Sequence, residues 1–399
     1  MRRVLVDLLF FTGTKGGMES YVREVYSRLT ADDPELEYLG YASSELAATG
    51  APWFPGNLID SGVSGEDRVA WARSELISVA RAASRHGADV VHCPANFGPL
   101  HSRVPVVLTI HDLLAFRHPE YVPGAYARIL RTMIRLAARS ARRILTVSRA
   151  SRDDIVAFLD VPAERVLVTP LAASTTSDSA PARRRADLLL AVGNRMPHKG
   201  FQTLLEALAR IDVEHRPSLV ITGSHGDDPL APLVERLGLD DHVDLRGWLS
   251  RDELDHLYAE STVLVFPTRF EGFGLPPLDA MARGCPVIVS DLPVLREVAG
   301  DAAVYIDPAD PEAIARAIRS LLDSPGDLER MSQAGIERAG RYSWERTAAA
   351  TREALLEVLS RRAVSDPSPP RGGRRKGGIT PSSASRTRRN GGATSPQSR

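Results

Sequence analysis

The sequence predicts an α/β protein with two doubly wound domains, each built on a parallel sheet. Short runs rich in valine, isoleucine and leucine alternate with helical patterns, as expected for parallel strands buried on both faces by crossover helices. The alternation stops at a polar, proline-containing linker at residues 173–186 and restarts after it. The chain has 399 residues, of which 43% are hydrophobic and 25% charged, which is enough for two or three buried cores.

The first domain is expected to span residues 1–172. Its strands are predicted at the apolar runs 4–10, 36–41, 89–92, 104–110, 143–147 and 166–169. Its helices are predicted near residues 18–30, 66–86, 123–141 and 149–159. This order of strand, helix and strand is typical of a parallel sheet covered on both faces.

The second domain is expected to span residues 187–342. Its strands are predicted at 188–192, 218–222, 243–245, 263–266, 287–290 and 303–306. Its helices are predicted near 200–210, 228–237, 251–259, 275–283, 311–323 and 326–340. In this class of fold, ligands bind in the crevice at the carboxyl ends of the strands, so the two domains are expected to face a common cleft.

A C-terminal helix is predicted at residues 343–362 and a disordered basic tail at 363–399. The tail holds eight basic residues and one acidic residue among glycine, serine and proline, with almost nothing apolar to bury. Without it, residues 1–362 carry a net charge of about −7. We interpret the tail as a solvated terminus, and contact with anionic lipid or nucleic acid is the alternative.

Charge and cysteine content argue against several classes of protein. Basic and acidic residues both number 50, which gives no overall reason to expect nucleic acid as a partner. Cys93 and Cys285 are too few for a disulfide framework or a zinc cage, so a reducing, cytoplasmic setting is expected. No run approaches the roughly 18 to 20 apolar residues of a membrane helix.

The helix predicted near 123–141, taken with the two residues that follow it, bears on membrane contact. Its arginines, which alternate with apolar residues, are Arg128, Arg131, Arg135, Arg139, Arg142 and Arg143. A basic amphipathic helix can dock on anionic lipid, which would give a peripheral contact at the inner face of a membrane. Because arginine dominates the whole chain, we favour an ordinary solvated helix packed on its own sheet.

Residues 266–282 carry the strongest chemical signal. They join a predicted buried strand to a helix with two prolines in its first turn, so a helix N-terminus faces the crevice. Gly272 and Gly274 leave backbone N–H groups open to an oxygen-rich anionic ligand. Glu271 and Asp279 flank this volume, and carboxylates accept hydrogen bonds from sugar hydroxyls. In the alternative interpretation, Asp279 only complements the helix dipole.

Residues 192–200 form a second loop between a strand and a helix. Arg195 and Lys199 place two cations at a helix start, a setting that suits a diphosphate. The sequence holds only three lysines, Lys15, Lys199 and Lys376, against 47 arginines, which favours a specific need for a compact ammonium in this loop. The alternative is a surface pair without function.

Two loops of the first domain complete the candidate site. Gly16 and Gly17 follow the first strand in a loop that is not a G-x-G-x-x-G fingerprint, so a dinucleotide site is not indicated. Their backbone can approach a ligand, and a plain tight turn is the alternative. His111 follows the strand at 104–110 and is interpreted as a hydrogen-bonding group oriented by Asp112, although a lone histidine is often structural.

Residues 266–282 resemble the signature of retaining glycosyltransferases of family 4, which have the GT-B fold and transfer sugar from a nucleotide-sugar. That signature has two glutamates separated by seven residues, the first near the donor sugar and the second bonding the ribose. Glu271 matches the first, whereas Asp279 stands at the second with a shorter side chain. The stretch whose backbone meets donor sugar and phosphate is matched by Gly272, Phe273, Gly274 and Leu275.

The resemblance covers roughly residues 1–360 and includes the phosphate-binding loop. Lys199 stands at the lysine that binds the pyrophosphate in the family. The arginine that usually follows the first glycine of this loop is replaced by Asn194, and Arg195 lies one place later. The resemblance therefore implies that Lys199 and Arg195 bind the diphosphate of the donor.

Three further matches complete the resemblance. Gly16 and Gly17 match a double-glycine loop that borders the donor phosphate and the acceptor. His111 resembles the active-site histidine next to the donor sugar. Trp248 and Leu249 belong to a segment that resembles the loop that meets the base.

By this resemblance, the protein is expected to be a retaining hexosyltransferase with catalytic residues His111 and Glu271. A nucleotide diphosphate sugar is expected as co-substrate, a glycan or lipid-linked sugar as acceptor, and no bound metal or other cofactor. Similarity of residues 111–120 and 194–199 to mannosyltransferase-like members makes GDP-mannose the first candidate donor. The alternatives are a nucleotide-sugar epimerase of the same fold and a non-catalytic nucleotide-sugar-binding protein; an NAD-linked dehydrogenase ranks last because its fingerprint is missing.

Overall fold

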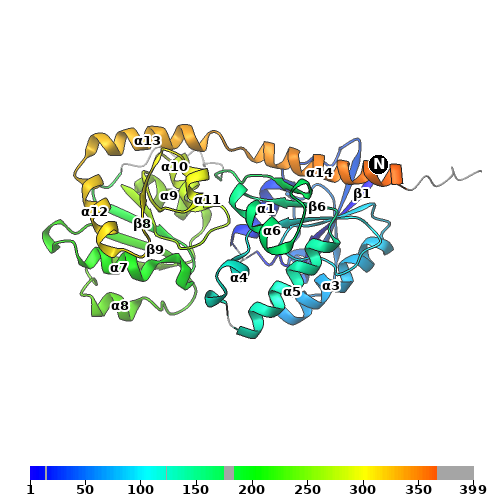
Figure 1. Cartoon of the computed structure of the whole chain (residues 1–399), viewed down its shortest axis with the longest axis horizontal. Coiled ribbons are helices and arrows are strands. Elements are labelled where there is room, and N and C mark those ends of the chain that lie inside the picture. The colour runs from blue at the N-terminus through cyan, green and yellow to red at the C-terminus, as the bar shows by residue number, and fades with distance from the viewer. Residues whose placement is uncertain (14–15, 123, 175–183, 366–399) are drawn as a thin grey trace, which may run out of the picture.

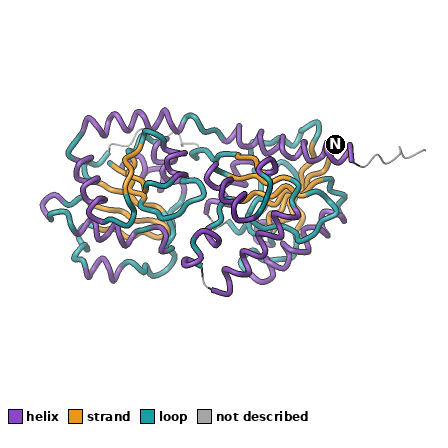
Figure 2. The backbone as a smooth tube through the Cα atoms, viewed as in Figure 1, coloured by secondary structure: helices purple, strands orange, loops and turns teal. Residues whose placement is uncertain are grey.

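The structure is a computed structural model that describes residues 1–13, 16–122, 124–174 and 184–365 (Figure 1). Two lobes lie side by side, and each has a parallel sheet at its centre with helices on both sides (Figure 2). This arrangement confirms the predicted α/β class. Most of the predicted tail, residues 366–399, and most of the predicted linker, residues 175–183, lie outside the described residues.

The first sheet has the order β3-β2-β1-β4-β5-β6-β7 among the described residues, and its strands are all parallel. Its strands are β1 (Arg2–Leu8), β2 (Leu36–Ala42), β3 (Asn57–Asp60), β4 (Val90–Cys93), β5 (Val106–Ile110), β6 (Arg143–Thr146) and β7 (Val166–Val168). The prediction missed β3, because this edge strand has four residues and only partial burial, which leaves no continuous apolar run.

The helices of the first lobe follow the predicted order with two short additions. They are α1 (Gly16–Tyr26), α2 (Ser44–Thr49), α3 (Arg68–Arg85), α4 (Leu114–Arg117), α5 (Gly124–Ser140) and α6 (Arg149–Leu159). Side-chain caps define several starts: Asp67 accepts from the first turn of α3, and Ser148 accepts from Ser151 in α6. Helices α2 and α4 are too short for sequence periodicity to reveal them.

The second sheet has the order β10-β9-β8-β11-β12-β13 in the described part of the chain, again with parallel strands. Its strands are β8 (Leu188–Val192), β9 (Ser218–Ser224), β10 (Val243–Gly247), β11 (Val263–Phe266), β12 (Val287–Ser290) and β13 (Ala303–Ile306). Its helices are α7 (Phe201–Ala209), α8 (Ala231–Arg236), α9 (Arg251–Glu260), α10 (Leu275–Ala282), α11 (Pro293–Ala299), α12 (Pro311–Leu322) and α13 (Pro325–Ala339). The prediction missed only α11 among these helices.

The last helix, α14 (Trp344–Ser365), leaves the second lobe and packs on the first (Figure 1). Arg352 makes an ion pair with Asp33 at 2.6 Å, and Arg28 bonds Glu345 at 2.8 Å. Residues 363–365 belong to this helix, so it extends three residues beyond the predicted bound at 362. None of the helices within the described ranges combines the length and apolar character needed to cross a bilayer.

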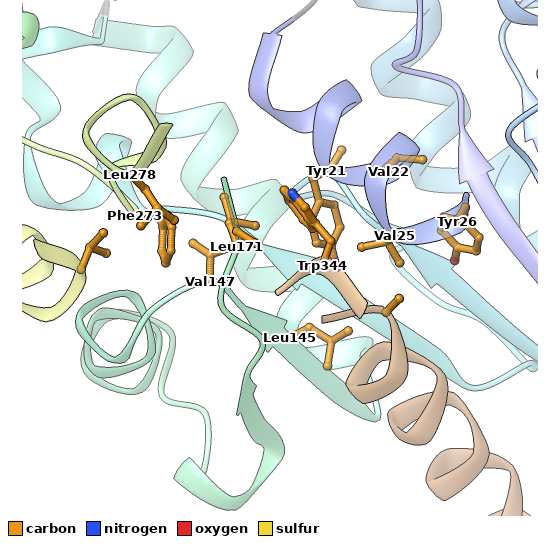
Figure 3. Close-up of a cluster of buried hydrophobic side chains, with 14 of the residues drawn as sticks. Tyr21, Val22, Val25, Tyr26, Leu145, Val147, Leu171, Phe273, Leu278 and Trp344 are labelled. Atoms are coloured by element: carbon orange, nitrogen blue, oxygen red, sulfur yellow. The ribbon is translucent and has the colours of Figure 1, made fainter. Parts of the chain in front are cut away.

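A buried cluster joins the two lobes where the chain passes between them. Tyr21 and Trp344 lie on the side of the first lobe, and Phe273 lies on the side of the second, with Val147 and Leu171 between them (Figure 3). Because these side chains are almost fully buried, the lobes share apolar packing in addition to two chain crossings.

Each sheet reverses its strand order at one place, between β1 and β4 in the first lobe and between β8 and β11 in the second. Loops that leave neighbouring strands at such a place diverge and leave a crevice. The loops after β1, β8 and β11 carry predicted site residues, and His111 follows β5, the neighbour of β4.

Candidate active site

The centre of the candidate site is an ion pair between Lys199 and Glu271. The Lys199 Nζ lies 2.6 Å from the Glu271 Oε1, and about 15% of each side chain is exposed. Lys199 comes from the loop after β8 and Glu271 from the loop after β11, the two strands that flank the crevice of the second sheet. The structure thus brings together two residues that are 72 positions apart in the sequence.

Gly200 lets these two loops cross closely. Its φ is +72°, and a Cβ on this residue would lie 2.1 Å from the carbonyl oxygen of Pro267. Only glycine fits such a backbone position without displacing the neighbouring loop. The Lys199 Nζ also lies 5.6 Å from the centre of the Phe266 ring, which adds a cation–π contact.

The turn after Glu271 contacts the first lobe directly. A Cβ on Gly272 would lie 2.3 Å from the His111 carbonyl oxygen, so the two backbones meet there. Ser148 and Ser151, at the start of α6, donate hydrogen bonds from Oγ to the Gly272 carbonyl at 2.7 and 3.0 Å. The Ser151 Oγ also lies 3.1 Å from the His111 carbonyl oxygen, so its single proton is shared between the backbones of both lobes.

His111 lies against this turn with a fixed ring. Its Nε2 donates to the Pro94 carbonyl at 2.8 Å, and its ring meets the edge of Tyr21 with centres 4.9 Å apart. Burial lowers the pKa of His111, so at neutral pH the ring is neutral and Nδ1 is an acceptor. Asp112, the residue expected to orient His111, accepts a hydrogen bond at Oδ1 from the Leu114 N–H at the start of α4.

Aromatic rings from both lobes meet in the segments beside Lys199. His118 of the first lobe packs on Phe270 with ring centres 5.5 Å apart, and Tyr121 packs on His198 at 5.7 Å. Burial and the neighbouring Lys199 lower the pKa of His198 to about 4, so this ring is neutral at pH 7. Sequence reasoning did not select these residues, although His118 and His198 lie inside the segments that it discussed.

Arg195 has a different surrounding from the one expected. Its Nη2 lies 2.6 Å from Asp228 Oδ2, its Nε bonds the same carboxylate, and Nη1 donates to the Thr222 carbonyl at 2.8 Å. Only 7% of the side chain is exposed. The guanidinium therefore ties the β8 loop to β9 and its following loop, and it does not face the cleft as a second free cation.

Asp279 is buried and faces the segment that joins the lobes. Its Oδ1 accepts from the Ser174 N–H at 2.8 Å and from the Ser174 hydroxyl at 2.9 Å, with Arg283 Nη1 at 3.7 Å. Burial raises the pKa of Asp279, whereas Arg283 and Ser174 lower it. The carboxylate thus anchors the connecting segment on α10, a contact that sequence reasoning did not anticipate.

Trp248 of the second lobe covers the loop after β1. A Cβ on Gly16 would lie 3.1 Å from the Trp248 ring, and Trp248 stacks on His225 with ring centres 5.2 Å apart. Half of the Trp248 side chain is exposed, which leaves a ring surface available for a planar base. Gly17 is exposed beside Gly16, whereas Lys15 lies outside the described residues.

Four other predicted positions belong to the turn and loop just described. Leu249 packs partly buried on the core next to Trp248, and Phe273 is buried in the cluster between the lobes. Gly274 precedes α10 and Leu275 begins it. Because Pro276 and Pro277 carry no N–H, Leu275 supplies the N–H among the first three positions of this helix. No group of three or more candidate ligands able to hold a metal ion occurs among the described residues; transfer without metal stays a prediction.

Two family models match consecutive parts of the chain. The model described as Glycosyltransferase Family 4 matches residues 15–177, and the one described as Glycosyl transferases group 1 matches residues 175–338. The chain is 34% identical over 272 residues to O-antigen chain mannosyltransferase B of Escherichia coli, an alignment that covers 64% of this chain and 71% of that protein. The protein is a family 4 glycosyltransferase.

Further comparisons agree with this family. The glycosyltransferase is 34% identical over 238 residues to the MMP alpha-(1->4)-mannosyltransferase of Mycolicibacterium hassiacum, and the alignment covers 58% of each chain. The solved structure of Anabaena Alr3699/HepE in complex with UDP and glucose matches with a TM-score of 0.68 at 17% identity, covering 89% of this chain and 99% of that one. This likeness confirms the GT-B fold of the glycosyltransferase.

Proposed function

We propose that the protein transfers a sugar, with mannose as the first candidate, from a nucleoside diphosphate to a glycan or lipid-linked acceptor with retention of configuration. The observation that carries the proposal is the Lys199–Glu271 pair, which lies beside the start of α10 and next to the turn that meets His111. A cation, the Leu275 N–H and a neutral histidine thus lie on segments that meet between the lobes.

The chemistry needs a stabilised leaving group. The bond between the anomeric carbon and the diphosphate oxygen breaks, and the acceptor oxygen bonds the same carbon from the same face. The acceptor proton passes to the departing diphosphate. Lys199 and the Leu275 N–H at the start of α10 stabilise the charge that develops on this diphosphate without moving during the reaction.

His111 and Glu271 act on the donor sugar in this proposal. The Pro94 carbonyl holds the Nε2 proton of His111, so Nδ1 can accept a hydrogen bond from a sugar hydroxyl. Glu271 holds Lys199 in the free protein, and the incoming diphosphate takes over part of that contact. The Glu271 carboxylate is then available to a second sugar hydroxyl.

Different observations support the choice of donor sugar and the choice of nucleotide base. Mannose is supported by the names of the two relatives, both of which are mannosyltransferases. A base that stacks on the exposed Trp248 ring is supported by the His225–Trp248 pair. Guanine rests on the family resemblance alone, whereas the solved relative was crystallised with UDP, so both nucleotides belong in the test.

A panel of nucleotide-sugars tests the proposal with the full chain. Binding is measured by thermal shift, and the product formed with a mannosyl acceptor is analysed by NMR for the anomeric configuration. Lys199→Ala is expected to lower turnover by about 100-fold or more, in the range of lost electrostatic stabilisation, with an unchanged circular dichroism spectrum. Near-normal turnover of this variant, or an inverted product, would contradict the proposal.

The same assay without acceptor separates the alternatives. An epimerase converts the donor sugar in the absence of any acceptor, and a non-catalytic protein binds the donor without consuming it. As a control, Glu235→Gln changes an exposed carboxylate on α8 and is expected to keep full turnover.

We also propose a peripheral contact with the anionic inner face of a membrane, through α5. The outer face of this helix exposes Tyr126, Ile129 and Leu136 beside Arg128 and Arg135, and α5 contains no acidic residue. Exposed apolar side chains between arginines favour insertion at an anionic surface over simple solvation. This observation changes the interpretation that we favoured from the sequence.

Vesicle flotation tests the membrane contact. The full chain is expected to float with phosphatidylglycerol vesicles and not with phosphatidylcholine vesicles, since only the former attract the arginines. Ile129→Ser combined with Arg128→Gln should abolish flotation, whereas Arg316→Gln combined with Arg319→Gln on α12 should not. Equal flotation of the α5 variant would contradict the proposal.

A further inference from the structure

A pocket lies where the two connecting chain segments pass between the lobes, apart from Lys199 and Glu271. We call it the hinge pocket. Its volume is about 790 Å³. It is lined by the start of α6, the end of β7 and the residues after it, α11, the end of α13 and the segment between α13 and α14. This volume is in the range of small-molecule sites, about 300 to 1,000 Å³. Helices α6 and α11 lie side by side between the lobes (Figure 1).

Positive charge dominates the lining of this hinge pocket. Its arginines are Arg149, Arg296, Arg338 and Arg341, and its one lining carboxylate is Glu297. That carboxylate already accepts hydrogen bonds from the backbone N–H groups of Arg149 at 2.9 Å and Ala150 at 3.3 Å, where it caps α6. The pocket therefore has a clear excess of donors for an anion.

Two of the four guanidinium groups are available for a ligand. Arg338 donates to the carbonyls of Glu297 and Val298, and Arg296 pairs with Asp291 on the surface. In contrast, the guanidinium groups of Arg149 and Arg341 make no hydrogen bond or ion pair with other residues that the structure describes. Unpaired arginines that face a concave surface are suited to bidentate binding of phosphate.

The pocket spans both lobes and both chain crossings. Arg149 belongs to the first lobe and Arg296 to the second, while Pro170 and Arg341 lie on the two segments that connect them. A ligand that contacts all of these residues binds best when the lobes are in the observed arrangement. By linkage, it stabilises that arrangement.

The pocket also contacts the turn of the candidate active site. Tyr342, on the pocket wall, packs edge-on against Phe273 with ring centres 5.7 Å apart. Arg149 directly follows Ser148, which donates to the Gly272 carbonyl. A ligand in the hinge pocket therefore lies one side chain away from the Gly272–Phe273 turn.

We propose that the hinge pocket is a second anion-binding site, for a small phosphorylated molecule, distinct from the site of the sugar donor. The unpaired Arg149 and Arg341 bind the phosphate groups, and the Pro170, Pro293 and Tyr342 walls contact the rest of the molecule. The bound molecule holds the two lobes in the arrangement in which Gly272 meets His111. This proposal does not depend on the identity of the donor or acceptor.

Inorganic pyrophosphate is the probe, and the full chain with Lys199→Ala is the background, because this substitution weakens the competing donor site. Isothermal titration is expected to show pyrophosphate binding to this variant with a rise in melting temperature. Adding Arg149→Gln and Arg341→Gln is expected to weaken that binding by at least tenfold, since both direct contacts are lost. Both residues are exposed, so the variants should fold.

Arg330→Gln is the matched control, because it removes an exposed arginine of α13 outside the pocket. It is expected to leave pyrophosphate binding unchanged. The proposal is overturned if the Lys199→Ala protein binds no pyrophosphate, or if the Arg149 and Arg341 substitutions leave its affinity unchanged. Sugar transfer by the Arg149→Gln/Arg341→Gln protein with Lys199 intact reports on the proposed activity separately, so the two proposals can fail independently.

Discussion

Asp7 and Glu75 place two carboxyl groups in contact inside the first lobe. Both residues are about 1% exposed, and the Trp71 indole N–H donates to Glu75 at 2.9 Å. Burial raises the pKa of Asp7, and burial together with the charge of Asp7 raises the pKa of Glu75 well above its ordinary value. The folded pair therefore keeps a proton that the unfolded chain loses in mild acid.

This pair predicts a dependence of stability on pH. Because the folded pKa values lie above the unfolded ones, the free energy of unfolding falls as the pH rises from the unfolded carboxyl range through the folded pKa. Glu75→Gln supplies a permanent amide donor to Asp7 and is expected to stabilise the protein at pH 8 by about 1 kcal/mol. Urea unfolding at pH 6 and pH 8 measures both effects, with Asp32→Asn at an exposed carboxylate as the control. The raised pKa values of the pair would be refuted if Glu75→Gln lost more stability between pH 6 and pH 8 than the parent, or if it behaved like the control.

At the same scale, sequence reasoning identified residue types better than it identified their partners. The loop context of Lys199 and Glu271 was readable because both follow apolar strands at the same edge of one sheet. The partner of Arg195 was not readable, since Asp228 lies 33 residues away in a loop with no motif. Ser148 and Ser151 had a weak signal only, as a capping serine and its neighbour at the start of a helix.

Among the elements, those with long apolar runs were predicted with accurate bounds. Strands β8, β11, β12 and β13 occupy the predicted residues. Helix α11 was missed because it has seven residues, begins at a proline and has no side-chain cap. It nevertheless shapes both the hinge pocket and the support of the Gly272 turn, so a short element without periodicity carries much of the connection between the lobes.

Helix α14 shows that the spacing of apolar residues along the sequence does not determine where a helix packs. Its pattern predicts a helix but not the lobe on which it packs, and its partners on the first lobe, Asp33 and Glu35, are more than 300 residues away. The hydrogen bond from Arg352 lowers the pKa of Asp33 to about 2. This contribution to stability is present above the unfolded pKa and is lost as the pH falls through about 2.

Removing this pair tests how firmly α14 holds the first lobe. Arg352→Gln is expected to destabilise the protein by about 1 to 2 kcal/mol at pH 7, less than a fully buried pair, because Arg352 is partly exposed. The difference from the parent should shrink as the pH approaches the folded pKa of Asp33. Chemical denaturation from pH 7 toward the folded pKa of Asp33 measures this difference in stability. Arg361→Gln, on the exposed end of α14, is the control. Equal stability of the parent and Arg352→Gln would show that apolar packing alone holds α14 on the first lobe.

At the scale of the whole molecule, the candidate site exists only because two lobes meet. The fold class and the sheet edge that carries the candidate site were predictable, since strand alternation restarts once and such sheets bind ligands at their carboxyl edge. The contact itself was not, because Gly272, His111 and Ser151 come from two loops and the start of α6, whose approach depends on the relative position of the lobes. Because Ser151 lies where these segments meet, we expect its substitution to affect sugar transfer more than folding.

Ser151→Ala removes the hydroxyl that bonds the His111 and Gly272 carbonyls, and it leaves the Ser148 cap of α6 in place because Ser148 accepts from the Ser151 backbone. Loss of this one hydroxyl proton, shared between two carbonyls and worth about 1 kcal/mol, predicts a fall in kcat/KM of about fivefold. Steady-state transfer assays measure this fall, and small-angle scattering should show a larger radius of gyration as the lobes separate. Ser320→Ala, on the exposed face of α12, is the control and is expected to match the parent in both measurements. If Ser151→Ala also matches the parent, the Ser151 contact does not hold the lobes together.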